Sequence, residues 1–334
     1  MNSIATKSPQ SKRLALGQLV DTAVSNYGLV LVVLLMIGVF AILKPDTYFT
    51  VDNLLSIATS QAIVALLALS ILGVLIVGEF DLSFASILGL CQVMVIGLMA
   101  NSSWSWPTAC VAVVALGLAA GLINAFLVVR MQVSSFVATM GLSTVVGGLA
   151  VGYSGGMVVT GALPDAFYNL AQISPLGIPM PIWYVVIVAI LLYTLFEFTS
   201  TGRHMRAVGG NRAAARLAGI SISRALTVAF VIAGVLAGLG AIVSGSLLGS
   251  GQPLAAAGYL LPAYAGAFLG ATTITPGRFN VWGTLVGVYL LGAGVSGLQQ
   301  LGFAPWVQDL FNGAMLLLAV AFSGYLTRVR GGRK

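Results

Sequence analysis

Residues 107–129 read PTACVAVVALGLAAGLINAFLVV, and this stretch decides the class of fold. It contains no charged residue and is as long as the roughly 20 residues that a helix needs to cross the hydrocarbon core of a bilayer. Inside lipid, backbone amides must be satisfied within the segment itself, and an α-helix does this. The stretch therefore predicts a membrane-spanning helix.

Comparable apolar stretches recur along the whole chain and predict an all-α, polytopic membrane bundle. Hydrophobic residues make up 59% of the sequence and charged residues 7%, against about 25% charged residues in a soluble domain. A soluble fold could not cover its surface with so few charges. About ten spans are predicted, at 27–43, 54–77, 84–100, 107–129, 134–153, 181–197, 225–250, 257–274, 279–298 and 307–325.

The predicted organisation is one transmembrane domain, 27–325, between a cytoplasmic tail at 1–26 and a basic tail at 326–334. Positively charged loops stay on the cytoplasmic side of a membrane. With ten spans and both termini inside, all basic residues except Lys44 fall inside, so the chain is expected to be a multi-pass protein of a bacterial inner membrane. The net charge of +7 is then a property of cytoplasmic loops, and no nucleic-acid partner is predicted.

No catalytic, cofactor-binding or metal-binding motif is present in the sequence. It lacks the GxxxxGK[ST] loop that cradles nucleotide phosphates, and its one histidine and two cysteines have no metal-ligand spacing. Most of the eight acidic residues lie in tails, loops or span ends. The chain therefore offers no strong ion-coupling group, and uphill transport would need an energised partner.

Two acidic residues, Glu79 and Asp81, lie between the second and third predicted spans, within GEFDLS at 78–83. One interpretation is a short cytoplasmic-side loop in which Asp81 caps the following helix. A second is a structural acid at a break in a membrane helix. A third is a proton relay.

The largest cytoplasmic loop, 198–224, contains the sequence TGRHMRAVGGNRAAARLAGI at 201–220. Gly209 and Gly210 are predicted to break the chain, with Asn211 as the N-cap of a two-turn helix and Gly219 as its left-handed stop. So short a helix is marginal alone in water, which favours docking against a partner. The alternative is an amphipathic loop held by membrane lipid headgroups.

Pairs of glycines four residues apart occur in several predicted spans, and they allow close helix packing. Packing within one chain is favoured over a dimer interface. The pairs are Gly117/Gly121, Gly148/Gly152, Gly234/Gly238, Gly245/Gly249, Gly266/Gly270 and Gly283/Gly287.

Four segments in order along the chain carry a family resemblance: GEFDLS at 78–83, SSFVATMG at 134–141, the 202–220 loop and PGRFNVWGTL at 276–285. Together they resemble the permeases of ribose-type sugar ABC importers, within a larger family that includes branched-chain amino acid and nucleoside permeases. Glu79 and Phe80 stand where that family often has glycine and isoleucine. This departure puts in doubt any substrate read from close relatives.

The resemblance implies a non-catalytic permease subunit for a small sugar, such as a pentose, hexose or sugar alcohol. It implies a homodimer or heterodimer with a second permease copy, ATP-binding cassette subunits that hold ATP and magnesium, and a periplasmic substrate-binding protein. The 202–220 loop would be the coupling helix. The coupling residues are Gly202, Arg203, Gly209, Gly210, Asn211, Arg212, Ala214, Arg216 and Gly219, and the translocation-path candidates are Glu79, Asp81, Asn124, Phe136 and Thr139.

Two alternatives stay open at this point. One is a permease of the same family for nucleosides or branched-chain amino acids. The other, from a different class, is an ion-coupled secondary transporter, which the scarcity of acidic residues in the spans disfavours.

Overall fold

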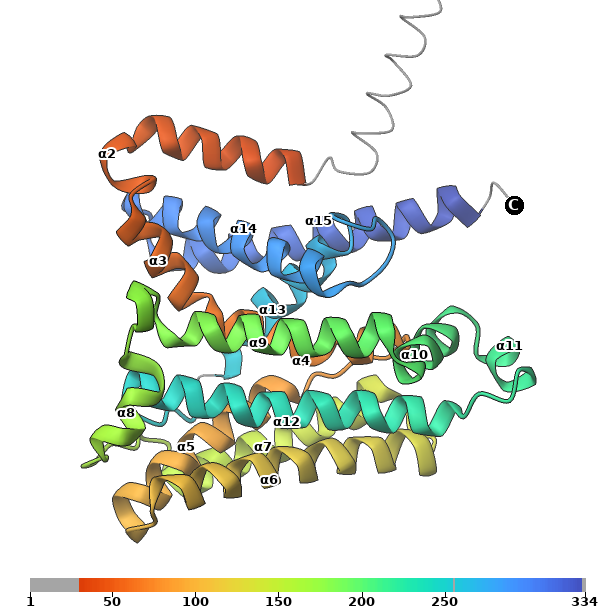
Figure 1. Ribbon diagram of the computed structural model, residues 1–334, viewed down its shortest axis with the longest axis horizontal. Coiled ribbons are helices and arrows are strands. Elements are labelled where there is room, and N and C mark those ends of the chain that lie inside the picture. Colours follow the sequence, from red (N-terminus) through yellow and green to blue (C-terminus); the bar gives the residue numbers. More distant parts are fainter. Residues whose placement is uncertain (1–29, 255, 332–334) are drawn as a thin grey trace, which may run out of the picture.

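The computed structural model describes residues 30–254 and 256–331, and within them every regular element is helical (Figure 1). The predicted N-terminal tail, 1–26, lies outside the described residues. The first helix described is Val30–Leu43. The α-helices that follow are α2 (Pro45–Tyr48), α3 (Val51–Ser60), α4 (Ala62–Ile76), α5 (Phe84–Ser102), α6 (Trp106–Ala125), α7 (Ser135–Ser154), α8 (Asp165–Gln172), α9 (Met180–Tyr193), α10 (Ser200–Gly210), α11 (Arg212–Leu217), α12 (Ile222–Leu248), α13 (Ala256–Gly270), α14 (Val281–Gln300) and α15 (Pro305–Gly331).

Three shorter helical elements complete the described chain. The π-helical turns η1 (Phe126–Arg130) and η3 (Thr194–Phe198) extend α6 and α9, and the 3-10 turn η2 (Pro175–Gly177) precedes α9.

The described residues contain six helices that are long and apolar enough to cross a membrane, or seven if the bent pair α3 and α4, which meet at 44°, forms one span. The all-helical, multi-pass class is therefore confirmed. Each of the ten predicted ranges overlaps a helix or, at 54–77, the bent pair α3 and α4, but within the described residues three of these helices do not meet the criteria for a full span. These three helices are Val30–Leu43, α13 and α15.

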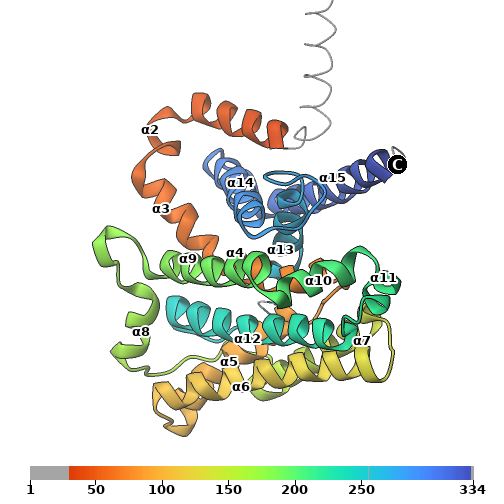
Figure 2. The ribbon, with the colours of Figure 1, turned by 45° about the vertical axis from the view of Figure 1, so that its right-hand side comes forward.

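Helix α4 forms the centre of the bundle, and all of its residues are buried. Its sequence is apolar on every face, as expected of a helix that neighbours surround completely. The single hydroxyl, Ser70 Oγ, donates a hydrogen bond to the Leu67 carbonyl at 2.7 Å and so needs no other partner. Helices α9, α12, α13 and α14 pack around it (Figure 2).

Glycine pairs bring neighbouring helices into backbone contact, as the sequence predicts. A Cβ on Gly117 of α6 would collide with the Gly234 carbonyl oxygen of α12, and one on Gly270 of α13 would lie 2.5 Å from the Gly283 backbone of α14. Packing within the chain is thus confirmed for the α6–α12 and α13–α14 pairs. Gly148 on α7 has no atom within 4 Å of its Cβ position and does not pack in this way.

The elongated bundle has two distinct ends. Helices α10 and α11 lie at one end with the C-terminal part of α15, while α2 and α8 lie at the other (Figure 1). The two ends are called the α11 end and the α8 end below.

Helix α13 ends at Gly270, before the predicted end of the span at 274, because the chain turns there: the Thr273 N–H donates to the Gly270 carbonyl at 3.1 Å. At its other end, the chain after α12 turns back into the bundle before α13 begins. The Gln252 N–H donates to Gln92 Oε1 at 3.4 Å, and a Cβ on Gly251 would lie 2.7 Å from Val93 Cα. Both contacts are with the middle of α5, so α13 begins inside the bundle. It reaches Gly270 with only 15 residues.

Candidate functional site

Helix α11 forms at the position that the sequence predicts, with the predicted caps. The Asn211 side chain accepts a hydrogen bond from the Ala214 N–H at 3.0 Å, which satisfies one of the free amides of the first turn. Gly219 has a φ of +74°, and the Ile220 N–H donates to the Ala215 carbonyl at 3.0 Å, which closes the C-terminus. Capping hydrogen bonds at both ends therefore stabilise this short helix.

The surface of α11 is almost entirely free within the chain. Only Ala215 is buried, while Leu217 is 90% exposed and both Arg212 and Arg216 face outward. A short helix that leaves a leucine uncovered buries too little apolar surface to be stable through packing within this chain.

The break predicted at Gly209 and Gly210 lies one residue later, because α10 continues through both glycines, ends at Gly210 and has Asn211 as its C-cap. The reason for glycine at position 209 is close packing. A Cβ there would collide with the carbonyl oxygen of Ile76, the last residue of α4. Gly202 is likewise pressed against the Phe196 carbonyl, whereas Gly210 has nothing within 4 Å.

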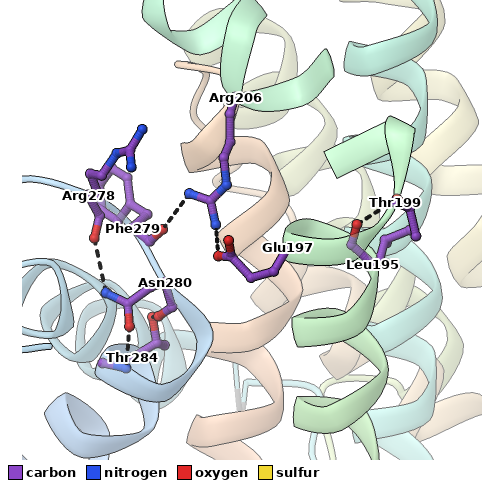
Figure 3. A network of polar contacts seen from close by, with 9 residues as sticks. Leu195, Glu197, Thr199, Arg206, Arg278, Phe279, Asn280 and Thr284 are labelled. Atoms are coloured by element: carbon purple, nitrogen blue, oxygen red, sulfur yellow. Dashed lines mark hydrogen bonds and ion pairs between the residues drawn. The ribbon is translucent and has the colours of Figure 1, made fainter. Parts of the chain in front are cut away.

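Arg206 fixes α10 to the helices beneath it (Figure 3). Its guanidinium pairs with the Glu197 carboxylate in η3 and donates to the Phe279 carbonyl at 3.5 Å. Phe279 precedes Asn280, whose Oδ1 accepts from the Gly283 N–H at 2.6 Å and caps α14. One arginine on α10 thus joins the end of α9 to the start of α14.

Arg212 makes the second attachment, directly from α11. Its Nη2 pairs with Glu79 Oε1 at 2.5 Å, and the other Glu79 oxygen accepts a hydrogen bond from Ser135 Oγ at the start of α7. The Glu79 side chain is 12% exposed, against 46% for Arg212. The ion pair therefore lies at the surface of the bundle, where the Glu79 side chain is mostly covered and the exposed Arg212 reaches in from α11.

The GEFDLS segment connects α4 to α5 and is bound by three other helices. The Leu82 N–H donates to Thr139 Oγ1 of α7 at 3.0 Å, and Asn124 Nδ2 of α6 donates to Ser83 Oγ at 2.7 Å. Tyr264 of α13 donates its hydroxyl to the Asp81 carbonyl at 2.6 Å and accepts from the Asp81 N–H at 3.1 Å. The segment opens at Gly78, whose φ of +78° suits glycine.

Asp81 is buried, with 1% of its surface exposed. Its Oδ1 accepts from both the N–H and the hydroxyl of Ser83, at 2.8 and 2.6 Å, so it forms a turn ahead of α5 rather than the predicted N-cap. Its Oδ2 and the Asn124 Oδ1 have no hydrogen-bond partner among the described residues. Burial raises the pKa of Asp81, which lies in the segment between the helices.

The structure brings the predicted path residues together at the α11 end. Glu79, Asp81, Asn124 and Thr139 belong to the hydrogen-bonded network just described, which shares Ser135 with the ion pair. Phe136 is 54% exposed and lines a groove of about 500 Å³ that Glu79, Arg212 and Arg216 also line. The predicted coupling residues and the predicted path residues therefore form one connected site.

Tyr264 is the member of this site that sequence reasoning missed. It lies 183 residues from Asp81 along the chain, within an apolar stretch that gives no signal of contact. Ser135 appears in the SSFVATMG segment, but nothing in that segment alone predicts its hydrogen bond to Glu79.

The arrangement connects the exposed helix α11 to the interior of the bundle through side-chain contacts. Within the described residues, no group of three or more histidine, cysteine or acidic side chains could hold a metal ion. A displacement of α11 would act on Glu79 through Arg212, and from there on α6, α7 and α13 through the GEFDLS segment.

Comparisons with known proteins show which family the chain resembles. A family model described as "Branched-chain amino acid transport system / permease component" matches residues 53–320. The chain is similar to the ribose import permease protein RbsC of Escherichia coli (strain K12), with 32% identity over 86% of this chain and 90% of the relative. It is also similar to the D-allose transport system permease protein AlsC of the same organism (29% identity; 91% and 93% covered) and to the L-arabinose ABC transporter permease protein AraH of Azospirillum brasilense (31%; 93% and 91%).

Proposed function

The chain belongs to the family of branched-chain amino acid transport system permease components, and from this membership we propose that it forms the membrane path of an ATP-driven importer for a small sugar. Its relatives at about 30% identity are named as permeases for ribose, D-allose and L-arabinose.

A single observation carries the coupling role: α11 is capped and exposed, yet attached to the bundle interior. Leu217 is left for a partner to cover, and Arg212 is paired with Glu79. An ATP-binding cassette subunit docked on α11 would move the GEFDLS segment whenever it closes.

The remaining parts of the proposed complex follow from the same role. Two ATP-binding cassette subunits at the α11 end bind ATP and magnesium, and this chain catalyses no reaction itself. A second permease copy completes the path, and a periplasmic binding protein delivers the sugar at the α8 end. The chain spans a bacterial inner membrane about ten times, with both termini in the cytoplasm.

The test is sugar-stimulated ATP hydrolysis and import by the complex of the chain with its cassette subunits and binding protein. Arg212→Glu with Arg216→Glu should lower both activities at least about tenfold, because two charges on the docking surface are reversed. Lys44→Glu is the matched control, since Lys44 is exposed at the other end of the bundle and its side chain makes no hydrogen bond or ion pair in the described part of the chain.

Two results would contradict the proposal. Unchanged stimulated hydrolysis in the double arginine variant would remove α11 from the coupling route. Accumulation of solute by the chain alone in liposomes, driven by an ion gradient, would instead identify a secondary transporter.

A further inference from the structure

A cavity of about 330 Å³ lies between α3, α13, α14 and α15, away from the site described above. Helix α14 begins beside Arg206 at the α11 end, so its last turns, which line this cavity, lie toward the α8 end. The cavity is called the outer cavity below. Its size is at the lower end of the range for small-molecule pockets, about 300–1,000 Å³.

The lining of the outer cavity is polar but carries no charge. Amides and hydroxyls contribute most of the polar groups, and none of the described residues that line it is acidic or basic. The polar lining residues include Ser56, Ser60, Gln61, Ser296, Gln308 and Asn312. A cavity of similar size, about 360 Å³ beside Trp106 and Tyr184, is lined almost wholly by apolar side chains, so a polar lining is not general in this bundle.

Two side chains in the outer cavity have hydrogen-bonding groups that the protein does not use. Asn312 is 5% exposed, and its side chain makes no hydrogen bond within the described part of the chain. The Gln61 amide is also unpaired among the described residues, and it lies against Gly292, where a Cβ would collide with its Cγ. Neither amide is among the fully buried side-chain groups that lack a partner, so both reach the space of the cavity, where they can form hydrogen bonds with water or with a ligand.

Hydrogen bonds between uncharged side-chain amides hold the rim of the outer cavity in place. Gln300 Nε2 donates to Asn53 Oδ1 at 3.0 Å, and Gln299 Nε2 donates to Gln308 Oε1 at 3.0 Å. These bonds join α3 to α14 and α14 to α15. The cavity is thus built from fixed elements rather than from a loose surface.

We propose that the outer cavity binds a neutral, polyhydroxylated solute, of the size of a monosaccharide, within a single permease chain. Sugar hydroxyls both donate and accept hydrogen bonds, as do the amides of Gln61 and Asn312. An amino acid would bring an ammonium and a carboxylate into a lining with no opposite charge, which is unfavourable. This inference rests on the proposed function and narrows it to a neutral substrate.

The first test is import by the full complex in proteoliposomes, with labelled D-ribose, D-allose and L-arabinose as probes. Asn312→Leu and Gln61→Leu should each raise the KM for import about three- to tenfold, the loss of one hydrogen bond to a neutral group. Asn312→Ser should recover part of the loss. Asn101→Leu is the matched control, because Asn101 is exposed near the α8 end but does not line the cavity.

The second measurement does not depend on how well those variants fold. In a chain with Cys91 and Cys110 replaced by alanine, a cysteine introduced at Ser60, which is exposed and lines the cavity, should react more slowly with a small thiol reagent when sugar is present. A cysteine introduced at Asn101 should show no protection.

The outcomes separate the two proposals. If the unmodified complex imports a sugar while the cavity variants keep its KM and the cysteine at Ser60 is not protected, the outer cavity is no sugar site and the proposed function stands. If the unmodified complex imports none of the three sugars, the sugar function fails and this inference fails with it.

Discussion

At the scale of single residues, Asp81 is the most informative side chain. Its Oδ1 accepts two hydrogen bonds from Ser83, and its buried Oδ2 has no hydrogen-bond partner among the described residues. An ionised carboxylate in that position would be costly, whereas a protonated one is neutral. The residue therefore fits a neutral structural acid better than it fits an anion that attracts a coupling ion.

We predict that Asp81→Asn keeps assembly and import, because the amide retains the Oδ1 acceptor and is neutral. Burial raises the pKa of Asp81, so the folded chain holds a proton that the unfolded chain releases. This stability is complete below the unfolded pKa of about 3.9 and is lost as the pH rises through the folded pKa.

The measurement is the melting temperature of both chains from about pH 5 to about pH 8. The advantage of Asp81→Asn over the unmodified chain should grow as the pH rises. Asp81→Leu should melt lower at every pH, since the Ser83 N–H then loses its acceptor. An advantage of Asp81→Asn that stays constant over this pH range would show that the carboxylate is already ionised in the fold.

The Glu79–Arg212 pair should be tested as a coupled pair rather than as a source of stability. Because Arg212 is half exposed, the pair contributes only about 0.5 kcal/mol. Glu79→Gln and Arg212→Gln should each reduce sugar-stimulated ATP hydrolysis, and the double variant should be no worse than the more affected single variant. Arg212→Gln combined with Glu197→Gln is the control, because Glu197 pairs with Arg206 and its effect should add.

At the scale of helices, the junction of α4 and α10 depends on one glycine of the Gly209–Gly210 pair. We predict that Gly209→Ala lowers stability by about 1–3 kcal/mol, since its Cβ would collide with the Ile76 carbonyl. Gly210→Ala provides the control on the next residue, where nothing lies within 4 Å.

The measurements for this junction are thermal melting in detergent and co-purification with the cassette subunits. Gly209→Ala should lower both the melting temperature and the amount of cassette subunit that co-purifies, while Gly210→Ala should leave both unchanged. Equal behaviour of the two variants would mean that α10 does not need to touch α4.

The sequence predicts helices well where the local signal is sufficient. Asn211 and Gly219 determine the two ends of α11. Both signals lie in the local sequence, so the position of α11 could be predicted. The role of Gly209 could not, because a glycine needed for close packing looks the same in sequence as one that breaks a helix. The predicted span 257–274 runs past the end of α13 because the residues after Gly270 are also apolar or small, and hydropathy carries no information on the turn that Thr272 and Thr273 form there.

At the scale of the whole molecule, the connected site at the α11 end is the part that a single sequence reveals least. Asp81 and Tyr264 are held together by two hydrogen bonds across most of the chain. Positions of candidate residues were predictable from motifs and polarity. Their assembly follows from how α6, α7 and α13 pack, which no local pattern specifies.

The orientation of the bundle gives the last prediction. Helix α9 with its extension η3, Met180–Phe198, is a candidate membrane span of 19 residues, and it connects Leu176 to the segment that contains Leu217. Leu217 on α11 and Leu176 near the other end are 90% and 89% exposed, so cysteines there should be accessible. In a chain with Cys91 and Cys110 replaced by alanine, Leu176→Cys should react with a membrane-impermeant thiol reagent in intact spheroplasts. Leu217→Cys should react only in inverted vesicles. The opposite pattern would reverse the orientation that the basic residues predict, and labelling of both from one side would mean that the segment Met180–Phe198 does not cross the membrane.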